Sequence, residues 1–406
     1  MTETNSSDRH KRHITIVSET FPPEINGVAN TLGRLCQGLI GLGHQVTVVR
    51  PRQPQERTGL VTNNRNNPCL REFTVHSLPL PGYTDLRLGI TRPVTLKKLW
   101  KPDPPDCIYI ATQGPLGLSA TTAAKHLGIP VTSGFHTNFH NYSHYYGLGS
   151  LERFLCAYGR WFHNRTAMTL VPTRKTQATA QAMGISNTAL WSRGVDCQQF
   201  TPHKRSASLR KRWGLTESDR AVLYVGRLAP EKNLQLAINS FNRIRRMHAN
   251  VRFILVGDGP MRAQLEDQNP DFIFCGMQRG ESLAQHYASG DLFLFPSKTD
   301  TFGNVVLEAM ASGLGVVAFD DAAASEHIRH NDNGLKAPLD DDANFIKHAL
   351  RLAGQPSLLH RVRTKSRLDA LDLNWSSQIN QFERLVCTPN IEAQHHAIDK
   401  QSIPTL

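Results

Sequence analysis

The 406-residue sequence lacks any long apolar stretch, and its few cysteines form no recognisable pattern. No run approaches the roughly 20 residues that a membrane-spanning helix needs. The polar N-terminus, MTETNSSDRHKRH, has no apolar signal core, so we do not expect secretion. The seven cysteines are odd in number and include no C-x-x-C pair. This favours reduced thiols in a cytoplasmic protein over a disulfide framework or a zinc site.

Acidic residues are scarce in the first half of the chain. Residues 1–200 contain 21 Lys and Arg against 11 Asp and Glu, whereas residues 201–406 contain 25 against 23. A basic field of this kind attracts anionic membranes, nucleic acid or a phosphorylated substrate, and composition does not choose among them. The charge is diffuse, without aromatic-basic repeats or a recognised binding module, which disfavours nucleic acid as the partner.

Apolar residues make up 39% of the chain and charged residues 20%, as in a globular protein, and the length suits two domains. An apolar run at 13–18 is followed by a Pro/Gly-rich loop, then by apolar residues at helical spacing, then by a second run at 45–49. The same order restarts at 221–226 and continues to 251–257. The pattern predicts an α/β protein with two Rossmann-like domains, whose parallel sheets present their carboxyl-end loops to a cleft.

The expected domain organisation follows from this restart. We expect a first Rossmann-like domain over residues 1–195 and a second over 196–370. A C-terminal helix over 371–387 is expected to pack back on the first domain, and residues 388–406 form a tail.

Four segments resemble, in order, those of family 4 of the retaining glycosyltransferases, which has the GT-B fold: PPEINGVANTL, VLYVGRLAPEKN, FILVGDGPMRAQLE and FPSKTDTFGNVVLEAMASGLGVVAFD. The last is the most specific, because it holds two acidic residues separated by seven, Asp300 and Glu308, before a Gly-bounded strand. The resemblance extends through most of the chain and is looser in the first domain. It implies an N-terminal acceptor-binding domain, a C-terminal domain that binds a nucleotide diphosphate-sugar donor, and no metal or other cofactor.

Arg227 and Lys232 follow a predicted strand in GRLAPEK. An arginine offers a bidentate fork and a lysine a point charge, and both suit phosphate. The resemblance gives these two residues the donor diphosphate and the developing charge of the leaving group. The alternative is a surface pair in which Glu231 pairs locally.

The T-F-G-N stretch, with Phe302, Gly303, Asn304 and Val305, precedes or opens a predicted helix, and a helix N-terminus binds anions. Glu308, further along this helix, is implied to bind the ribose hydroxyls of the nucleotide. Asp300 stands where the family usually has Glu in contact with the donor sugar. The shorter side chain leaves that contact, and the donor identity, open. As an alternative, Asp300 caps the helix.

In the first domain, the resemblance makes Gly27 a backbone contact for the donor phosphate and places His136 beside the reacting sugar. A lone glycine before a helix is more often a turn. The spacing of His136, His140 and His144 also allows a metal site, but no H-E-x-x-H arrangement is present, and we favour His136 as a catalytic residue. Asp340 and Asp342 form a D-x-D pattern that we interpret as an acidic helix start.

The sequence says least about the acceptor. Apolar residues recur at helical spacing over 151–162 between arginines, and 92–101 is a second basic-apolar stretch. Each is either a core helix with solvated arginines or a surface for an anionic membrane. With the resemblance, they favour a peripheral enzyme on the inner membrane face that transfers mannose from GDP-mannose to a lipid-linked acceptor. The alternatives are a UDP-hexose-dependent diacylglycerol glycosyltransferase and a sugar-nucleotide epimerase.

Overall fold

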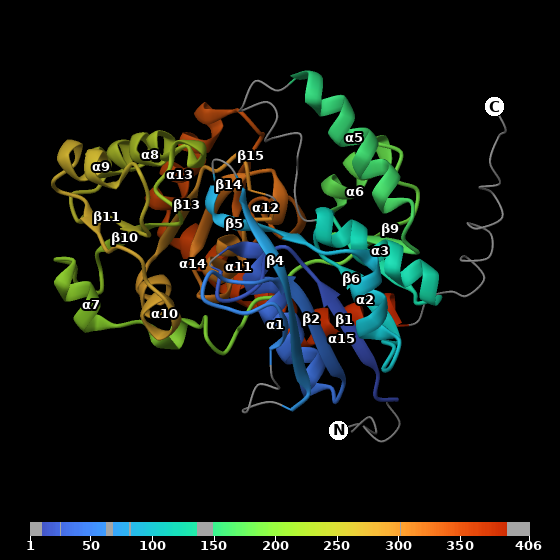
Figure 1. The fold of residues 1–406 in the computed structure, drawn as a ribbon. Coiled ribbons are helices and arrows are strands. Elements are labelled where there is room, and N and C mark those ends of the chain that lie inside the picture. The colour runs from blue at the N-terminus through green and yellow to red at the C-terminus, as the bar shows by residue number, and fades with distance from the viewer. Residues whose placement is uncertain are drawn as a thin grey trace, which may run out of the picture. The chain divides into compact units, whose positions relative to one another are not determined.

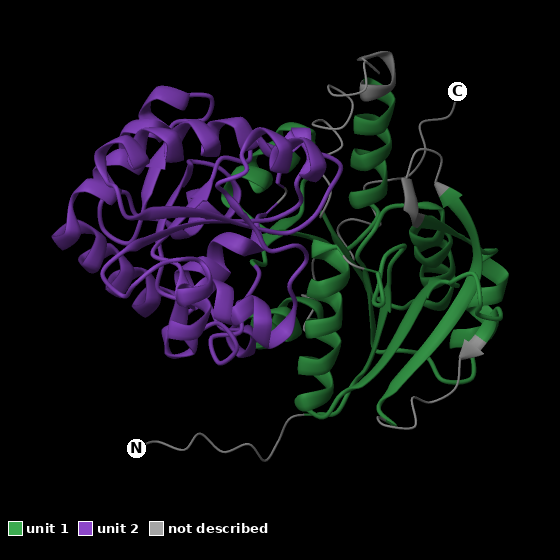
Figure 2. Ribbon diagram, turned by 90° about the vertical axis from the view of Figure 1, so that its left-hand side faces the viewer, with its two compact units in different colours: residues 1–192, 378–406 green, residues 193–377 purple. Residues whose placement is uncertain are grey.

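The computed structural model describes residues 10–24, 26–61, 68–80, 83–135, 149–300 and 302–387. The chain divides into two compact units, shown in different colours in Figure 2. Unit 1 comprises Met1–Ser192 and Gln378–Leu406, and unit 2 comprises Arg193–Ser377. The sequence had placed the domain boundary after residue 195. None of the helices in the described ranges is long and apolar enough to cross a membrane.

Unit 1 is built on one sheet, which has nine strands within the described ranges. Its strands run in the order β3-β4-β2-β1-β6-β7-β8-β9, with β5 paired to β4. All neighbouring strands are parallel except the β3–β4 and β4–β5 pairs, which are antiparallel and were not expected from the sequence. The strands are β1 (His13–Val17), β2 (Gln45–Pro51), β3 (Gly59–Val61), β4 (Leu70–Leu80), β5 (Tyr83–Ile90), β6 (Cys107–Ile110), β7 (Val131–Gly134), β8 (Met168–Val171) and β9 (Thr188–Leu190).

Helices cover both faces of this sheet. On one face, Val17, Ile108 and Ile110 join a buried cluster with residues of α2 and α3. The side chain of Tyr109 has the opposite orientation in β6 and packs against α15. The helices of unit 1 in the described ranges are α1 (Gly27–Gly41), α2 (Pro93–Trp100), α3 (Pro115–Leu127), α5 (Gly149–His163), α6 (Arg174–Ala182) and α15 (Trp375–Cys387).

Helix α15 lies within the stretch 371–387 that was expected to form a helix against the first domain. The ring of Phe382 is fully buried, with its centroid 4.9 Å from those of both Tyr109 and Trp191. A Cβ atom on Gly38 of α1 would lie 1.8 Å from Cδ1 of Ile379, so only a glycine allows this approach. All these contacts lie within unit 1. The tail at 388–406 falls outside the described residues.

Unit 2 has a six-stranded parallel sheet within the described residues, in the order β12-β11-β10-β13-β14-β15 (Figure 1). The strands are β10 (Arg220–Val225), β11 (Val251–Val256), β12 (Ile273–Phe274), β13 (Leu292–Phe295), β14 (Gly315–Phe319) and β15 (Leu335–Ala337). The helices are α7 (Ala207–Arg212), α8 (Leu234–Met247), α9 (Arg262–Gln268), α10 (Gly280–Ser289), α11 (Asn304–Ala311), α12 (Ala322–His327), α13 (Asp342–Gly354) and α14 (Pro356–Leu371), with single 3-10 turns η1 (Pro202–Lys204) and η2 (Pro230–Lys232).

Strand β10 shows why this sheet is covered on both faces. Leu223 and Val225 join a buried cluster with α10 and α11, whereas Val222 and Tyr224 join a second cluster with α8 and α13. Successive side chains of a strand point to opposite faces, so a continuous apolar run requires a helical layer on each side. The result is a doubly wound sheet, and its strand order matches that of a dinucleotide-binding domain.

Candidate donor site and its supporting residues

The strand order of unit 2 places its candidate site between β10 and β13. The chain leaves β10 toward β11 on one side and later returns to β13 on the other. Ligands of doubly wound sheets bind at the carboxyl ends of such a pair of strands. The segments that follow β10 and β13 are joined there, because Thr299 Oγ1 donates to Glu231 O at 3.2 Å and Asn233 Nδ2 donates to Pro296 O at 3.4 Å.

Lys232 and Asp300 meet at this edge. The Lys232 Nζ atom lies 2.9 Å from Asp300 Oδ2, and the two side chains are 18% and 26% exposed. The structure therefore brings together two of the predicted donor-site residues. The alternative that Asp300 caps the following helix is wrong, because α11 begins at Asn304 with Gly303 at the N-cap position.

Arg227 is largely open to solvent. Its side chain is 66% exposed, and its Nη1 lies 3.8 Å from Glu231 Oε1. Such an exposed pair contributes little free energy, so the guanidinium can exchange this partner for a stronger anion. The backbone of Arg227 is bound to the core, because the hydroxyl of the buried Tyr224 donates to Arg227 O at 3.0 Å.

The predicted phosphate-binding loop forms the N-terminus of α11. Phe302 is buried, Gly303 has a φ of 81°, and Asn304 and Val305 are the first two helical residues. Gly303 provides no side-chain cap for this helix. An N-terminus of this kind directs backbone N–H groups and a positive dipole end toward a ligand. The loop therefore has the geometry that an anion requires.

Arg193 supports this loop and was not anticipated from the sequence. It is 4% exposed, its guanidinium carbon lies 5.3 Å from the centroid of the Phe302 ring, and its Nη1 lies 3.5 Å from Asn304 Oδ1. On another side, Ala323 N donates to Phe302 O at 2.7 Å, and the ring of His327 lies 6.0 Å from that of Phe302. These contacts hold the loop in one conformation.

Glu308 lies one turn into α11, as predicted. Its Oε2 accepts a hydrogen bond of 2.9 Å from the hydroxyl of Tyr287, a residue of α10 that is fully buried. Sequence reasoning missed Tyr287. A tyrosine among the apolar residues of a predicted helix indicates a hydroxyl that needs a partner, but not which partner.

In unit 1, Gly27 is the first residue of α1 and does not form a turn of its own. The N-cap residue Asn26 accepts from Ala29 N at 2.8 Å and donates from Nδ2 to Thr20 Oγ1 at 2.6 Å. Thr20 Oγ1 in turn donates to Glu24 Oε2 at 2.5 Å. The loop before α1 is thus held by its own polar side chains.

His136, His140 and His144 lie outside the described residues, so their predicted catalytic or metal-binding roles remain predictions. Elsewhere in unit 1, Glu19 follows β1, the strand that pairs with both β2 and β6. Burial raises its pKa to about 7, and its carboxylate accepts from the backbone N–H groups of Gly89 and Leu116. Sequence reasoning did not single out Glu19.

The D-x-D pattern begins a helix, as predicted. Asp341 accepts from Asn344 N at 2.9 Å as the N-cap of α13, and Lys298 Nζ lies 3.0 Å from Asp340 Oδ1 and 3.3 Å from Asp342 Oδ1. Among the described residues, no group of three or more His, Cys, Asp or Glu side chains is placed to hold a metal ion. The seven cysteines all lie in the described ranges, and none of them forms a disulfide bond there.

Comparisons with known proteins agree with this architecture. Residues 25–199 match the model of glycosyltransferase family 4, and residues 219–355 match that of the glycosyl transferases group 1. A GDP-mannose-dependent alpha-mannosyltransferase from Mycobacterium tuberculosis is 34% identical over 339 residues, which cover 83% of this chain and 86% of that protein. An alpha-monoglucosyldiacylglycerol synthase from Acholeplasma laidlawii is 23% identical over 364 residues, which cover 85% of this chain and 89% of that protein.

Among solved structures, a sucrose-phosphate synthase from Thermosynechococcus elongatus superposes with a TM-score of 0.73 at 16% identity, covering 96% of this chain and all of that one. This likeness concerns the fold, and it agrees with two Rossmann-like units in tandem. The predicted α/β class and enzyme class are confirmed: the chain belongs to glycosyltransferase family 4, has the GT-B fold and is a glycosyltransferase.

Proposed function

We propose that this glycosyltransferase moves a mannosyl residue from GDP-mannose, with retention of configuration, to a lipid-linked acceptor. The observation that carries the donor assignment is the 34% identity, over 83% of the chain, to a protein whose name specifies GDP-mannose. The lipid acceptor is supported by the weaker similarity to a diacylglycerol-modifying enzyme. A UDP-hexose donor is the second candidate, since the same relative is a glucosyl-type enzyme by its name.

In this proposal the donor lies along the carboxyl edge of unit 2. Arg227 and Lys232 bind the diphosphate, and the N-terminus of α11 from Gly303 on adds backbone N–H groups. Glu308 accepts hydrogen bonds from the ribose hydroxyls, and Asp300 contacts the sugar. The ion pair between Lys232 and Asp300, 2.9 Å long, then orients the ammonium group before the donor arrives.

The transfer step needs no enzyme nucleophile in this proposal. The bond between the anomeric carbon and the β-phosphate oxygen breaks, and the bond to the acceptor oxygen forms on the same face of the sugar. The acceptor proton passes to the departing phosphate. Lys232 and Arg227 stabilise the charge that develops on that phosphate, and no metal ion is required. His136 is proposed to lie beside the reacting sugar. A covalent sugar adduct trapped on an Asp or Glu would contradict this step.

Helix α5 is the proposed membrane-facing element. Phe154 is 67% exposed and Trp161 is 43% exposed, so this helix presents two aromatic side chains to solvent. Arg153 and Arg160 are also exposed, and the guanidinium carbon of Arg165 lies 4.3 Å from the centroid of the Trp161 ring. Aromatic side chains flanked by arginines suit the interface of an anionic membrane. Such binding would place the enzyme on the inner face of the membrane.

The second basic-apolar stretch has a different role. Leu96 and Trp100 of α2 are buried against the sheet of unit 1, so its apolar face is part of the core. Its exposed surface carries Lys98 and a single large apolar side chain, that of Val94, and no aromatic ring. We therefore assign membrane contact to α5, and not to α2.

The first test is a thermal-shift panel of GDP, UDP, ADP and their hexose conjugates, because a ligand that binds the folded state raises the melting temperature. Stabilisation by GDP and GDP-mannose alone supports the proposal, and stabilisation by UDP compounds supports the second candidate. Donor turnover without lipid would indicate an epimerase. If no nucleotide shifts the melting temperature, the donor site assigned here is wrong.

The membrane part is tested separately by flotation with anionic and neutral vesicles. Exchange of Phe154 and Trp161 for Ser should abolish binding to anionic vesicles, whereas exchange of the exposed Met247 of α8 for Ser serves as the control. Equal flotation of both variants would remove α5 from the proposal and leave the donor assignment intact.

A further inference from the structure

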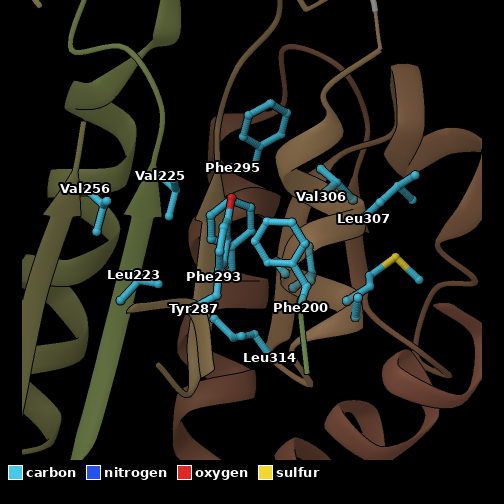
Figure 3. Packing of buried hydrophobic residues seen from close by; sticks show 14 of the residues in the cluster. Phe200, Leu223, Val225, Val256, Tyr287, Phe293, Phe295, Val306, Leu307 and Leu314 are labelled. Atoms are coloured by element: carbon cyan, nitrogen blue, oxygen red, sulfur yellow. The ribbon is translucent and has the colours of Figure 1, made fainter. Parts of the chain in front are cut away.

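Tyr287 is held in the apolar core of unit 2 by aromatic neighbours. Its side chain is fully buried, and the centroid of its ring lies 5.5 Å from that of Phe200 and 6.0 Å from that of Phe293. Figure 3 shows the three rings packed together with the Tyr287 hydroxyl at the end of its ring. The Phe200 contact is edge-to-face, at 89°, which is a favourable aromatic geometry. The ring position therefore leaves the hydroxyl little freedom.

The hydroxyl of Tyr287 donates a hydrogen bond of 2.9 Å to the carboxylate of Glu308. A buried phenol without an acceptor would cost free energy, so a tyrosine here needs such a partner, whereas a phenylalanine would not. The bond is a hydrogen bond to a carboxylate, which is stronger and shorter than one between neutral groups. It crosses from α10 to α11, two helices on the same face of the sheet.

We propose that Tyr287 is a positioning residue that fixes the Glu308 carboxylate for the ribose hydroxyls of the nucleotide. This inference rests on the proposed function, because Glu308 is assigned to ribose there. A carboxylate on a two-carbon stem rotates freely unless one oxygen is held. With Oε2 bonded to Tyr287, the plane of the carboxylate is set before the nucleotide binds, and this lowers the entropy cost of binding.

The chemistry of Tyr287 suits this role. Burial and the neighbouring Glu308 carboxylate raise its pKa well above the ordinary value. The phenol therefore stays protonated and remains a donor throughout the pH range in which an enzyme works. A carboxylate accepts hydrogen bonds and the ribose hydroxyls donate them, so Tyr287 and the ribose would both be donors to Glu308.

The test compares the binding of GDP and 2′,3′-dideoxy-GDP to the wild-type protein and to Tyr287→Phe by titration calorimetry. The wild type should bind GDP about 10- to 100-fold more tightly than the dideoxy analogue, which is the difference in affinity expected from hydrogen bonds to a charged group. Tyr287→Phe should lower that preference by about 5-fold or more and leave the affinity for the dideoxy analogue nearly unchanged. If Tyr287 had only a structural role, the exchange would weaken the binding of both ligands equally.

Tyr224→Phe is the matched control, because it also removes a buried hydroxyl in unit 2, one that donates to Arg227 O at 3.0 Å. It should leave the preference for GDP unchanged, since the diphosphate is common to both ligands. An unchanged preference in Tyr287→Phe overturns the inference and leaves the proposed function intact. A wild type that binds both ligands alike overturns the inference together with the ribose role of Glu308, while GDP-mannose stands as the proposed donor. A wild type that binds neither nucleotide overturns the proposed function as well.

Discussion

Two glycines at the ends of α11 allow the donor loop to be tested apart from stability. Gly303 precedes the helix with a φ of 81°, and Gly313 follows it with a φ of 71°. An L residue in this left-handed region costs about 1–2 kcal/mol. A Cβ at Gly303 would lie 3.1 Å from Cε1 of Phe295, and a Cβ at Gly313 would lie 2.9 Å from Cγ of Pro202. Exchange of either glycine for Ala is therefore expected to be destabilising.

We expect each variant to lose about 1–3 kcal/mol of unfolding free energy, from strain and crowding together. For a unit of this size, the melting temperature then falls by about 2–4 °C for each kcal/mol. The two variants should differ in function. Gly303→Ala disturbs the N–H groups that the diphosphate is proposed to use, so its donor KM should rise about 10-fold or more, the equivalent of one hydrogen bond to a charged group.

The assay is donor-dependent transfer at a temperature where circular dichroism shows both variants to be folded, with melting curves recorded in parallel. Gly313→Ala should keep the wild-type donor KM despite its lower melting temperature. If Gly303→Ala also keeps it, the N-terminus of α11 does not bind the diphosphate. If both variants lose donor affinity equally, the effect is one of stability, and the reasoning is refuted.

Three further results are expected. Lys232→Ala should lower kcat/KM by about 100- to 1,000-fold, because it removes a charge from the leaving diphosphate, and steady-state kinetics would check this. Burial lowers the pKa of His163 and of His327 to about 4 from 6.5. Because the unfolded chain takes up these protons first, the free energy of unfolding falls progressively between pH 6.5 and pH 4. Urea unfolding at pH 5 should therefore give a value lower than at pH 7.5 by about 2 kcal/mol per histidine. Phe382→Ala should lose about 3–5 kcal/mol, measured by urea unfolding, because it empties the site between Tyr109 and Trp191.

The sequence predicted the two α/β sheets well because parallel strands read as continuous apolar runs bounded by turn residues. The hairpin of β4 and β5 was missed, although the dipeptide Pro81-Gly82 between the two strands is a short turn sequence. The capping role considered for Asp300 was wrong because the helix starts later, at Asn304, after a glycine in the left-handed region. The pattern of residue types along the chain does not locate the first residue of a helix when the backbone conformation of a single glycine decides it.

The sequence alone determined the class of protein, a two-domain glycosyltransferase. The order of its motifs and their residue types placed Arg227 and Lys232 after a strand and Glu308 on a helix. Tertiary structure alone decided which side chains support them. Arg193, Tyr224 and Tyr287 are distant in sequence from their partners or hidden in the core, and only packing brings a guanidinium onto Phe302 or a phenol onto Glu308. A sequence pattern records periodicity along one element, whereas a hydrogen bond between two elements depends on how their faces meet.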